Sequence, residues 1–449
     1  MSDLAIGILG CVALLALLAA SMPVAFAMLI VGLVGFAVVV RPEAALSMAA
    51  GRLDATFRSY SLTVIPLFIL MGQIAFHAGI SRRLFNTAYK WVGFLPGGLA
   101  MATVGACTAF GAICGSSPAT AATMSSVALP EMKRYKYDME LATGAVAAGG
   151  SLGMLIPPSV VFIVYGVLTT QSIGALFIAG IVPGLLIAGL FCLAILVMCI
   201  RRPHMGPAGP KTTWGEKLRS LSGVWETLLL FVAVIGGMFL GFFTPTEAAA
   251  VGAAGSLVIA LIRRRLSWSV LRRSLMETAR TSCMVFMVVA GAVIFGVFLG
   301  RTGITRQVAS GLTELPLPGW GTMALIILFY LIGGCFVDAL ALMLLTVPIF
   351  ESVVVRDLGF ESIWFGVMIV IVTQMGVITP PVGVNVYVVS GIERDVPLQT
   401  IFKGSMPFLL ALIIAAALLV AFPEICLWLP GLVREIGRAS CRERVCHRV

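Results

Sequence analysis

Two short polar stretches lie inside apolar parts of this sequence, and their oxygen-bearing side chains have the chemistry of a cation site. Asp338 is the one charged residue between Met323 and Pro348. If that segment enters a membrane, its carboxylate costs at least ~2.5 kcal/mol on insertion scales. The second stretch carries the hydroxyls of Ser116 and Ser117. Hard oxygen donors suit Na⁺ better than a soft metal, so we expect Asp338 and Ser116 to bind Na⁺; the alternative is that Asp338 only caps a helix.

Two pairs of consecutive prolines, Pro157-Pro158 and Pro380-Pro381, interrupt other apolar segments. A proline removes a backbone donor and clashes with the preceding turn, so neither segment can form a continuous helix. In hydrocarbon, each freed backbone group costs several kcal/mol unless protein, water or a ligand takes it up. We therefore expect both breaks to line a binding site for a substrate or an ion.

Polar side chains flank the two breaks. Ser159 follows the first proline pair, and Thr379 and Asn385 lie on either side of the second. Each is a candidate for lining the site, and Thr379 is also a candidate Na⁺ ligand because its hydroxyl immediately precedes the prolines. The alternative is that the hydroxyl groups bond back to their own helices, as Ser and Thr in membrane helices often do.

The composition indicates a polytopic, all-α membrane protein. Of the 449 residues, 60% are hydrophobic and 11% are charged, whereas a soluble domain has roughly 25% charged residues. The uncharged segment Leu4–Val40, interrupted at Ser21-Met22-Pro23, predicts two membrane crossings, and no basic residue precedes it as in a cleavable signal peptide. The formal charge of +10 comes from basic clusters between apolar spans, and no nucleic-acid-reading motif is present.

Several other function classes lack their sequence signatures. Ten cysteines without a C-x-x-C pair and three scattered histidines predict neither disulfides nor a metal centre. No P-loop motif for ATP is present. An intramembrane enzyme would need a paired nucleophile and base or two facing carboxylates, and Asp338 is isolated. We expect no cofactor other than a coupling ion, and a transporter rather than an enzyme or a channel.

Five short motifs recur at a nearly constant spacing of about half the chain, which predicts an internal repeat. Pro23 matches Pro245, for example, and the first proline pair matches the second. The predicted boundaries are residues 1–200 for repeat one, 201–222 for a basic cytoplasmic loop and 223–430 for repeat two. The loops that are rich in basic residues in one repeat correspond to loops that are poor in them in the other. Corresponding loops should therefore lie on opposite sides of the membrane, which predicts inverted topology.

Each repeat contains an apolar segment that begins and ends on the same predicted side of the membrane, so we expect two re-entrant helical hairpins. They cover about residues 97–130 and 321–350, with Ser116 at the first tip and Asp338 at the second. The segments without proline pairs, Leu4–Val40 and Val224–Ile262, should form a fixed frame. In Thr244-Pro245-Thr246-Glu247, the spacing predicts a helix-capping box and not a ligand set.

Several of these motifs together resemble the large membrane subunit of the tripartite ATP-independent periplasmic (TRAP) transporters. The stretches that carry the resemblance are Gly115-Ser116-Ser117, Leu155-Ile156-Pro157-Pro158-Ser159, Gly241-Phe242-Phe243-Thr244-Pro245-Thr246-Glu247 and Thr379-Pro380-Pro381-Val382-Gly383. The resemblance runs from about Met1 to Pro430. It implies a multi-pass protein of the bacterial inner membrane that takes up organic anions, such as C4-dicarboxylates, with Na⁺.

The resemblance also implies partners and a mechanism. The partners are a small membrane subunit, a periplasmic substrate-binding protein, membrane lipid and a small organic anion. The mechanism is an elevator motion in which the hairpins move. A stand-alone dicarboxylate exchanger of related architecture, working without a binding protein, is the alternative. Residues 435–449 do not resemble the family and read like translated adapter DNA, so we expect a non-native tail there.

Overall fold

The computed structural model describes residues 2–314 and 318–432, and within these ranges the protein is all-helical. Six helical segments of the described chain are long and apolar enough to cross a membrane. The expected non-native tail, residues 435–449, lies outside the described residues. The six segments are Tyr60–His77, Ile173–Arg201, Pro245–Ile262, Trp268–Thr302, Ala339–Asp357 and Leu398–Ala421.

The described elements follow the same general order in both halves of the chain. The first half contains α1 (Asp3–Ala19), α2 (Val24–Val39), α3 (Pro42–Phe57), η1 (Tyr60–Thr63), α4 (Val64–His77), α5 (Ile80–Val92), α6 (Gly98–Cys114), α7 (Ser117–Arg134), α8 (Met139–Ser151), η2 (Leu152–Met154), α9 (Val160–Thr169) and α10 (Ile173–Arg201). The second half contains η3 (Pro203–Met205), α11 (Trp214–Leu221), α12 (Trp225–Phe231), η4 (Val232–Gly236), α13 (Gly237–Phe239), α14 (Pro245–Ile262), α15 (Trp268–Thr302), α16 (Ile304–Thr313), α17 (Gly319–Gly334), α18 (Ala339–Ser352), η5 (Val353–Asp357), α19 (Ser362–Gly376), α20 (Val384–Ile392) and α21 (Leu398–Ala421).

Local sequence signals determine where several of these helices begin. At α14, the Thr244 hydroxyl accepts a hydrogen bond from the Glu247 amide at 3.4 Å, and the Glu247 carboxylate accepts one from the Thr244 amide at 2.8 Å. The predicted capping box is therefore confirmed. The two proline pairs lie between helices, with α8 and η2 before the first and α19 before the second, and both Pro-Pro bonds are cis.

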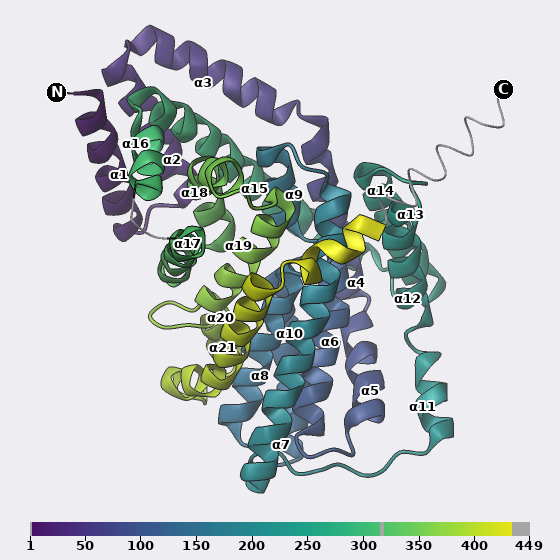
Figure 1. Ribbon diagram of the computed structural model, residues 1–449. Helices are drawn as coiled ribbons and strands as arrows, with labels where there is room; N and C mark the ends of the chain where they lie inside the picture. Colours follow the sequence, from purple (N-terminus) through teal and green to yellow (C-terminus); the bar gives the residue numbers. More distant parts are fainter. Residues whose placement is uncertain (1, 315–317, 433–449) are drawn as a thin grey trace, which may run out of the picture.

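Helices of the two halves pack against each other reciprocally. The second arm of each hairpin contacts the helix after the other half's proline break, α7 against α20 and α18 against α9. The long helices exchange partners in the same way, with α2 against α15 and α14 against α4. In Figure 1, α1–α3 lie at the upper left and α12–α14 at the right, with α4, α6, α9, α10 and α19 between them. The division into two repeats and their inverted topology both stay predictions.

The basic segment 201–222, which we predicted as a loop, contains the short helix α11. Its first turn is fixed by a capping box between Thr213 and Glu216. The ring of Trp214 meets Trp91 edge-on at 6.5 Å, and the Lys217 ammonium lies 4.7 Å from the centroid of Phe94. Helix α11 is bent by 53° from the helical segment that starts at Trp225. An amphipathic stretch with its own caps thus forms a helix even between two spans.

Candidate functional site

The tip of the first hairpin is pressed against the first proline break. Gly115, with φ of +64°, ends α6, and Ser116 is the N-cap of α7. A Cβ atom on Gly115 would lie 2.5 Å from the carbonyl oxygen of Pro158, and one on Gly153 would lie 2.9 Å from the carbonyl oxygen of Ser116. Only glycine permits these approaches, so the tip and the break form one compact unit.

The first break itself is fully enclosed by protein. Pro157, Pro158 and Ser159 are all buried. The Ser159 hydroxyl donates a hydrogen bond to the Met154 carbonyl across the break and accepts one from the Phe162 amide at 3.4 Å. This hydroxyl therefore caps α9 and takes up a carbonyl freed by the prolines. It is bonded locally, in line with the alternative to a role in lining the site.

The second hairpin is arranged in the same way around the second break. A Cβ atom on Gly376 would lie 2.3 Å from the carbonyl carbon of Gly334, so the backbones of α17 and α19 touch at the tip. The Thr379 hydroxyl, in the turn after α19, donates to the Met375 carbonyl in the last turn of that helix at 2.6 Å. Unlike the first pair, Pro380 and Pro381 are exposed. The second break is therefore open on one side where the first is closed.

Asp338 is the N-cap of α18, as the capping alternative states. One carboxylate oxygen accepts a hydrogen bond from the Leu340 amide at 3.0 Å. No Lys or Arg pairs with it within 4.0 Å in the part of the chain that the structure describes. A carboxylate has room for about four hydrogen bonds or ligands. Capping the helix thus leaves Asp338 free to hold a cation as well.

A buried amide joins the two halves at the first hairpin tip. The Ser117 hydroxyl donates to the side-chain oxygen of Asn385 at 2.9 Å, and the Asn385 side-chain nitrogen donates to the Ala147 carbonyl at 2.9 Å. Asn385 and Ser117 are both almost completely buried. Asn385, which follows the second break, therefore positions the tip of the first hairpin.

The two hairpin tips line a common cavity of about 180 Å³. Ser116 and Ser117 line it from the first tip and Asp338 from the second, while Gln73 of α4 and Thr281 of α15 close it from another side. The remaining candidates, Ser159, Thr379, Asn385 and the four prolines, do not line this cavity. The predicted residues thus separate into a group at the cavity and a group that shapes the breaks around it.

Helix ends give the cavity both signs of electrostatic potential. The first residues of α7 and of α18 line it, so two positive helix N-termini meet there. At α18 the Asp338 carboxylate compensates that charge, whereas at α7 the N-cap Ser116 makes no side-chain capping bond. The cavity therefore has a negative side at Asp338 and a side with free N–H groups at α7, which suits an anion.

Comparison with known proteins identifies the family. The family model of the tripartite ATP-independent periplasmic transporter, DctM component, matches residues 11–425. The C4-dicarboxylate TRAP transporter large permease protein DctM of Pseudomonas aeruginosa is 37% identical over 391 residues, which are 87% of this chain and 90% of that protein. The chain belongs to this family. The large permease protein SiaM of the Vibrio cholerae sialic acid TRAP transporter is 35% identical, over 94% of this chain and 98% of its own.

A solved transporter structure agrees with the fold of this TRAP large permease. The MtrF efflux pump of Neisseria gonorrhoeae superposes with a TM-score of 0.55 at 15% identity, covering 85% of this chain and 83% of its own. At this identity the likeness concerns the fold alone. Membership of the family makes the chain an integral inner-membrane transporter permease, in agreement with the composition.

Three polar residues near the site of this permease were not among the sequence-based candidates. Gln73 and Thr281 line the cavity. Gln374, one turn before the second break, is completely buried, and neither its oxygen nor its nitrogen has a hydrogen-bond partner among the described residues. Gln73 and Gln374 each stand alone as amides in apolar helices, a signal that the sequence does contain. Buried unsatisfied amides of this kind mark places for water or a ligand.

Proposed function

We propose that this permease imports a small organic anion together with Na⁺, and that a periplasmic binding protein delivers the anion. The observation that carries the proposal is the cavity between the hairpin tips, where an unpaired carboxylate faces hydroxyl oxygens. Asp338 and Ser116 are the proposed Na⁺ ligands at the cavity. Thr379 remains a third candidate, through the carbonyls around the second break, since its hydroxyl already donates to the Met375 carbonyl at the end of α19. Carboxylate, hydroxyl and carbonyl oxygens match the preference of a hard cation.

The proposed substrate class rests on the free N-terminus of α7. Its first residues, Ser117, Pro118 and Ala119, line the cavity without a side-chain cap, and Ser117 and Ala119 each carry a backbone N–H. The described lining contains no Lys or Arg. A helix N-terminus binds a carboxylate without a basic side chain. Two of the relatives are named for C4-dicarboxylates and for sialic acid, which are both carboxylic acids. We therefore propose a carboxylate substrate, with a small membrane subunit completing the transporter.

Uptake into proteoliposomes tests the coupling ion and the binding protein together. The permease and its small membrane subunit should take up substrate when an inward Na⁺ gradient is imposed and the binding protein is present outside. A proton gradient of the same size should drive little uptake, because the described lining of the cavity offers oxygen ligands and contains no histidine. A C4-dicarboxylate and sialic acid are suitable probes.

Different outcomes of this assay would contradict the Na⁺ coupling and the need for a binding protein. Equal uptake with a proton gradient alone would overturn Na⁺ coupling. Full uptake without the binding protein would favour the stand-alone exchanger instead. A voltage of matched size without a Na⁺ gradient serves as the control for driving force, since symport of excess cations also responds to membrane potential.

We further propose that the hairpins, the broken helices and the helices α10 and α21 that pack on them move as one body past a frame formed by α1, α2 and α12–α14. The frame segments contain no pair of consecutive prolines. Helices α4 and α15 lie between them and the hairpin-bearing body. Because each proposed hairpin opens to a different side, moving this body would expose the cavity alternately to either side. This exchange of sides is the elevator motion.

Spin-label distances test this motion. Labels at Val12 on α1 and Leu410 on α21, both exposed, should report two distances whose proportions change with Na⁺ and substrate. A second pair, Leu185 on α10 and Leu410, is the control, because α10 and α21 pack together in the moving body. If the Val12–Leu410 distance stays single and constant through turnover, the elevator mechanism is wrong.

A further inference from the structure

Polar residues continue from the cavity along the contact between α4 and α15, which we call the α4–α15 seam. On α15, Ser274, Glu277 and Thr281 follow one another at spacings of three and four, so they share one helix face. On α4, Gln73 and His77 are four apart. Gln73 and Thr281 belong to the cavity lining. The seam is therefore a polar extension of the cavity toward the start of α15.

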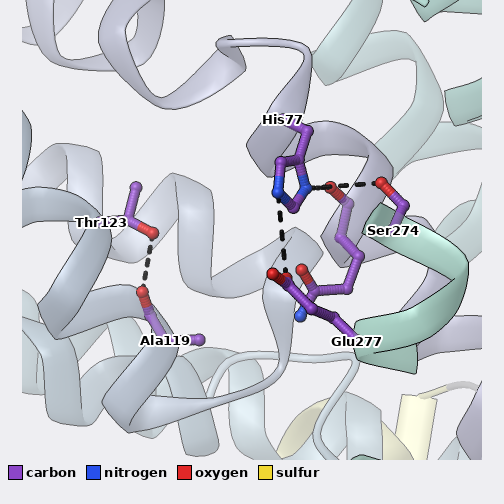
Figure 2. Close-up of polar contacts among 6 residues, drawn as sticks. His77, Ala119, Thr123, Ser274 and Glu277 are labelled. Carbon is purple, nitrogen blue, oxygen red and sulfur yellow. Dashed lines mark hydrogen bonds and ion pairs between the residues drawn. The ribbon is translucent and has the colours of Figure 1, made fainter. Parts of the chain in front are cut away.

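The histidine in the seam connects the two helices. His77 Nδ1 lies 2.9 Å from the Gln73 carbonyl oxygen and 3.4 Å from the Ser274 hydroxyl. His77 Nε2 lies 3.9 Å from a carboxylate oxygen of Glu277, and Figure 2 shows this cluster between α4 and α15. The His77 side chain is 9% exposed and that of Glu277 is 42% exposed. Glu277 thus lies at the accessible mouth of the seam, with His77 behind it.

Two buried oxygens along the seam lack hydrogen-bond partners among the described residues. They are the side-chain oxygen of Gln73 and the hydroxyl oxygen of Thr278, which is 7% exposed as a residue. A buried polar group without a partner is destabilising, and in native proteins water or an ion usually occupies such a place. Gln73 belongs to the cavity lining and Thr278 directly follows Glu277 on α15, so the two oxygens belong to opposite ends of the seam.

We propose that the α4–α15 seam is a hydrated route for the coupling cation, with Glu277 as the binding group at its mouth. The inference rests on the proposed Na⁺ coupling and adds a site outside the cavity. The groups that face the seam are oxygens, one carboxylate and one imidazole, while the nearby Arg280 is on the exposed side of α15. An anionic substrate is repelled by Glu277, so the cation and the substrate leave the cavity by different routes.

The first test uses Na⁺ and the complete transporter in proteoliposomes. Glu277→Gln should raise the Na⁺ concentration needed on the α15-start side for half-maximal inhibition of uptake by about tenfold, as expected for the loss of one charged ligand. The Na⁺ dependence on the opposite side should change little. Glu277→Asp keeps the charge and should show a Na⁺ dependence close to that of the wild type. Glu424→Gln, at an exposed carboxylate with no ion pair among the described residues, is the matched control.

A second measurement does not depend on coupling. In a background free of other cysteines, Ser274→Cys should react faster with the cationic trimethylammonioethyl methanethiosulfonate than with the anionic sulfonatoethyl reagent, and Na⁺ should slow the reaction. The control is a separate variant that keeps Cys283, on the exposed side of the same helix, as its single cysteine, and this variant should show no protection by Na⁺.

The two measurements separate the two proposals. If wild-type uptake proves independent of Na⁺, the proposed coupling is wrong, and the charge preference at Ser274→Cys then decides the route by itself. If uptake follows Na⁺ but Glu277→Gln behaves as Glu424→Gln does, the seam is not the route. Equal reaction with both reagents, or none, would likewise overturn it.

Discussion

Replacing Asp338 by asparagine should reduce Na⁺-driven uptake by at least about tenfold, the loss typical of disturbing the ligands of a bound ion. Asparagine keeps the shape of the side chain and is as good an N-cap as aspartate. It can still accept the hydrogen bond from the Leu340 amide, so α18 should begin at the same residue. The substitution therefore removes the charge at the cavity and preserves the cap.

The chain offers a matched control for this substitution. Asp138 is the N-cap of α8 and accepts a hydrogen bond from the Glu140 amide at 2.8 Å, the same arrangement as at Asp338. It does not line the cavity. Asp138→Asn should therefore leave uptake and its Na⁺ dependence close to those of the wild type. Wild-type uptake in the Asp338→Asn variant would show that the carboxylate is only a helix cap.

Replacing Gly115 by alanine should impair both uptake and thermal stability. An L-residue in this left-handed conformation costs roughly 1–2 kcal/mol, and the added Cβ would lie 2.5 Å from the Pro158 carbonyl oxygen. Because that oxygen belongs to the backbone of the first break, the hairpin tip must move away from it. Ser116 and Ser117, which line the cavity from this tip, would move with it.

Gly105→Ala, on the same helix, is the control for this second substitution. Its Cβ would have Ala88 Cβ as nearest neighbour, at 3.8 Å. Alanine in a helix interior is favoured over glycine by up to about 1 kcal/mol, so this variant should be at least as stable as the wild type. Melting temperature of the purified protein and uptake in proteoliposomes are the measurements. If Gly115→Ala behaves as Gly105→Ala does, the close approach of tip and break is not required.

The helix breaks and the residues around them show how far sequence reasoning reaches. The apolar composition and the proline pairs predicted an all-helical membrane protein with two broken helices, because proline acts on its own turn. The capping box at Thr244 was predicted correctly since both partners lie within one turn. At Thr379 and Ser159 the sequence left two roles open. The structure shows each hydroxyl bonded locally, and binding roles in this family stay predictions.

Local chemistry, then, was determined by the sequence alone: the membrane class, the helix breaks, the caps and the isolated carboxylate at Asp338. Only the tertiary structure decided which polar groups meet. Ser117 and Asn385 are 268 positions apart, and their hydrogen bond exists because α7 packs against α20. Gln73 and Thr281 reach the cavity in the same way, through the packing of α4 and α15. Such contacts depend on the shapes of many side chains at once, whereas caps and breaks depend on neighbours within a few residues.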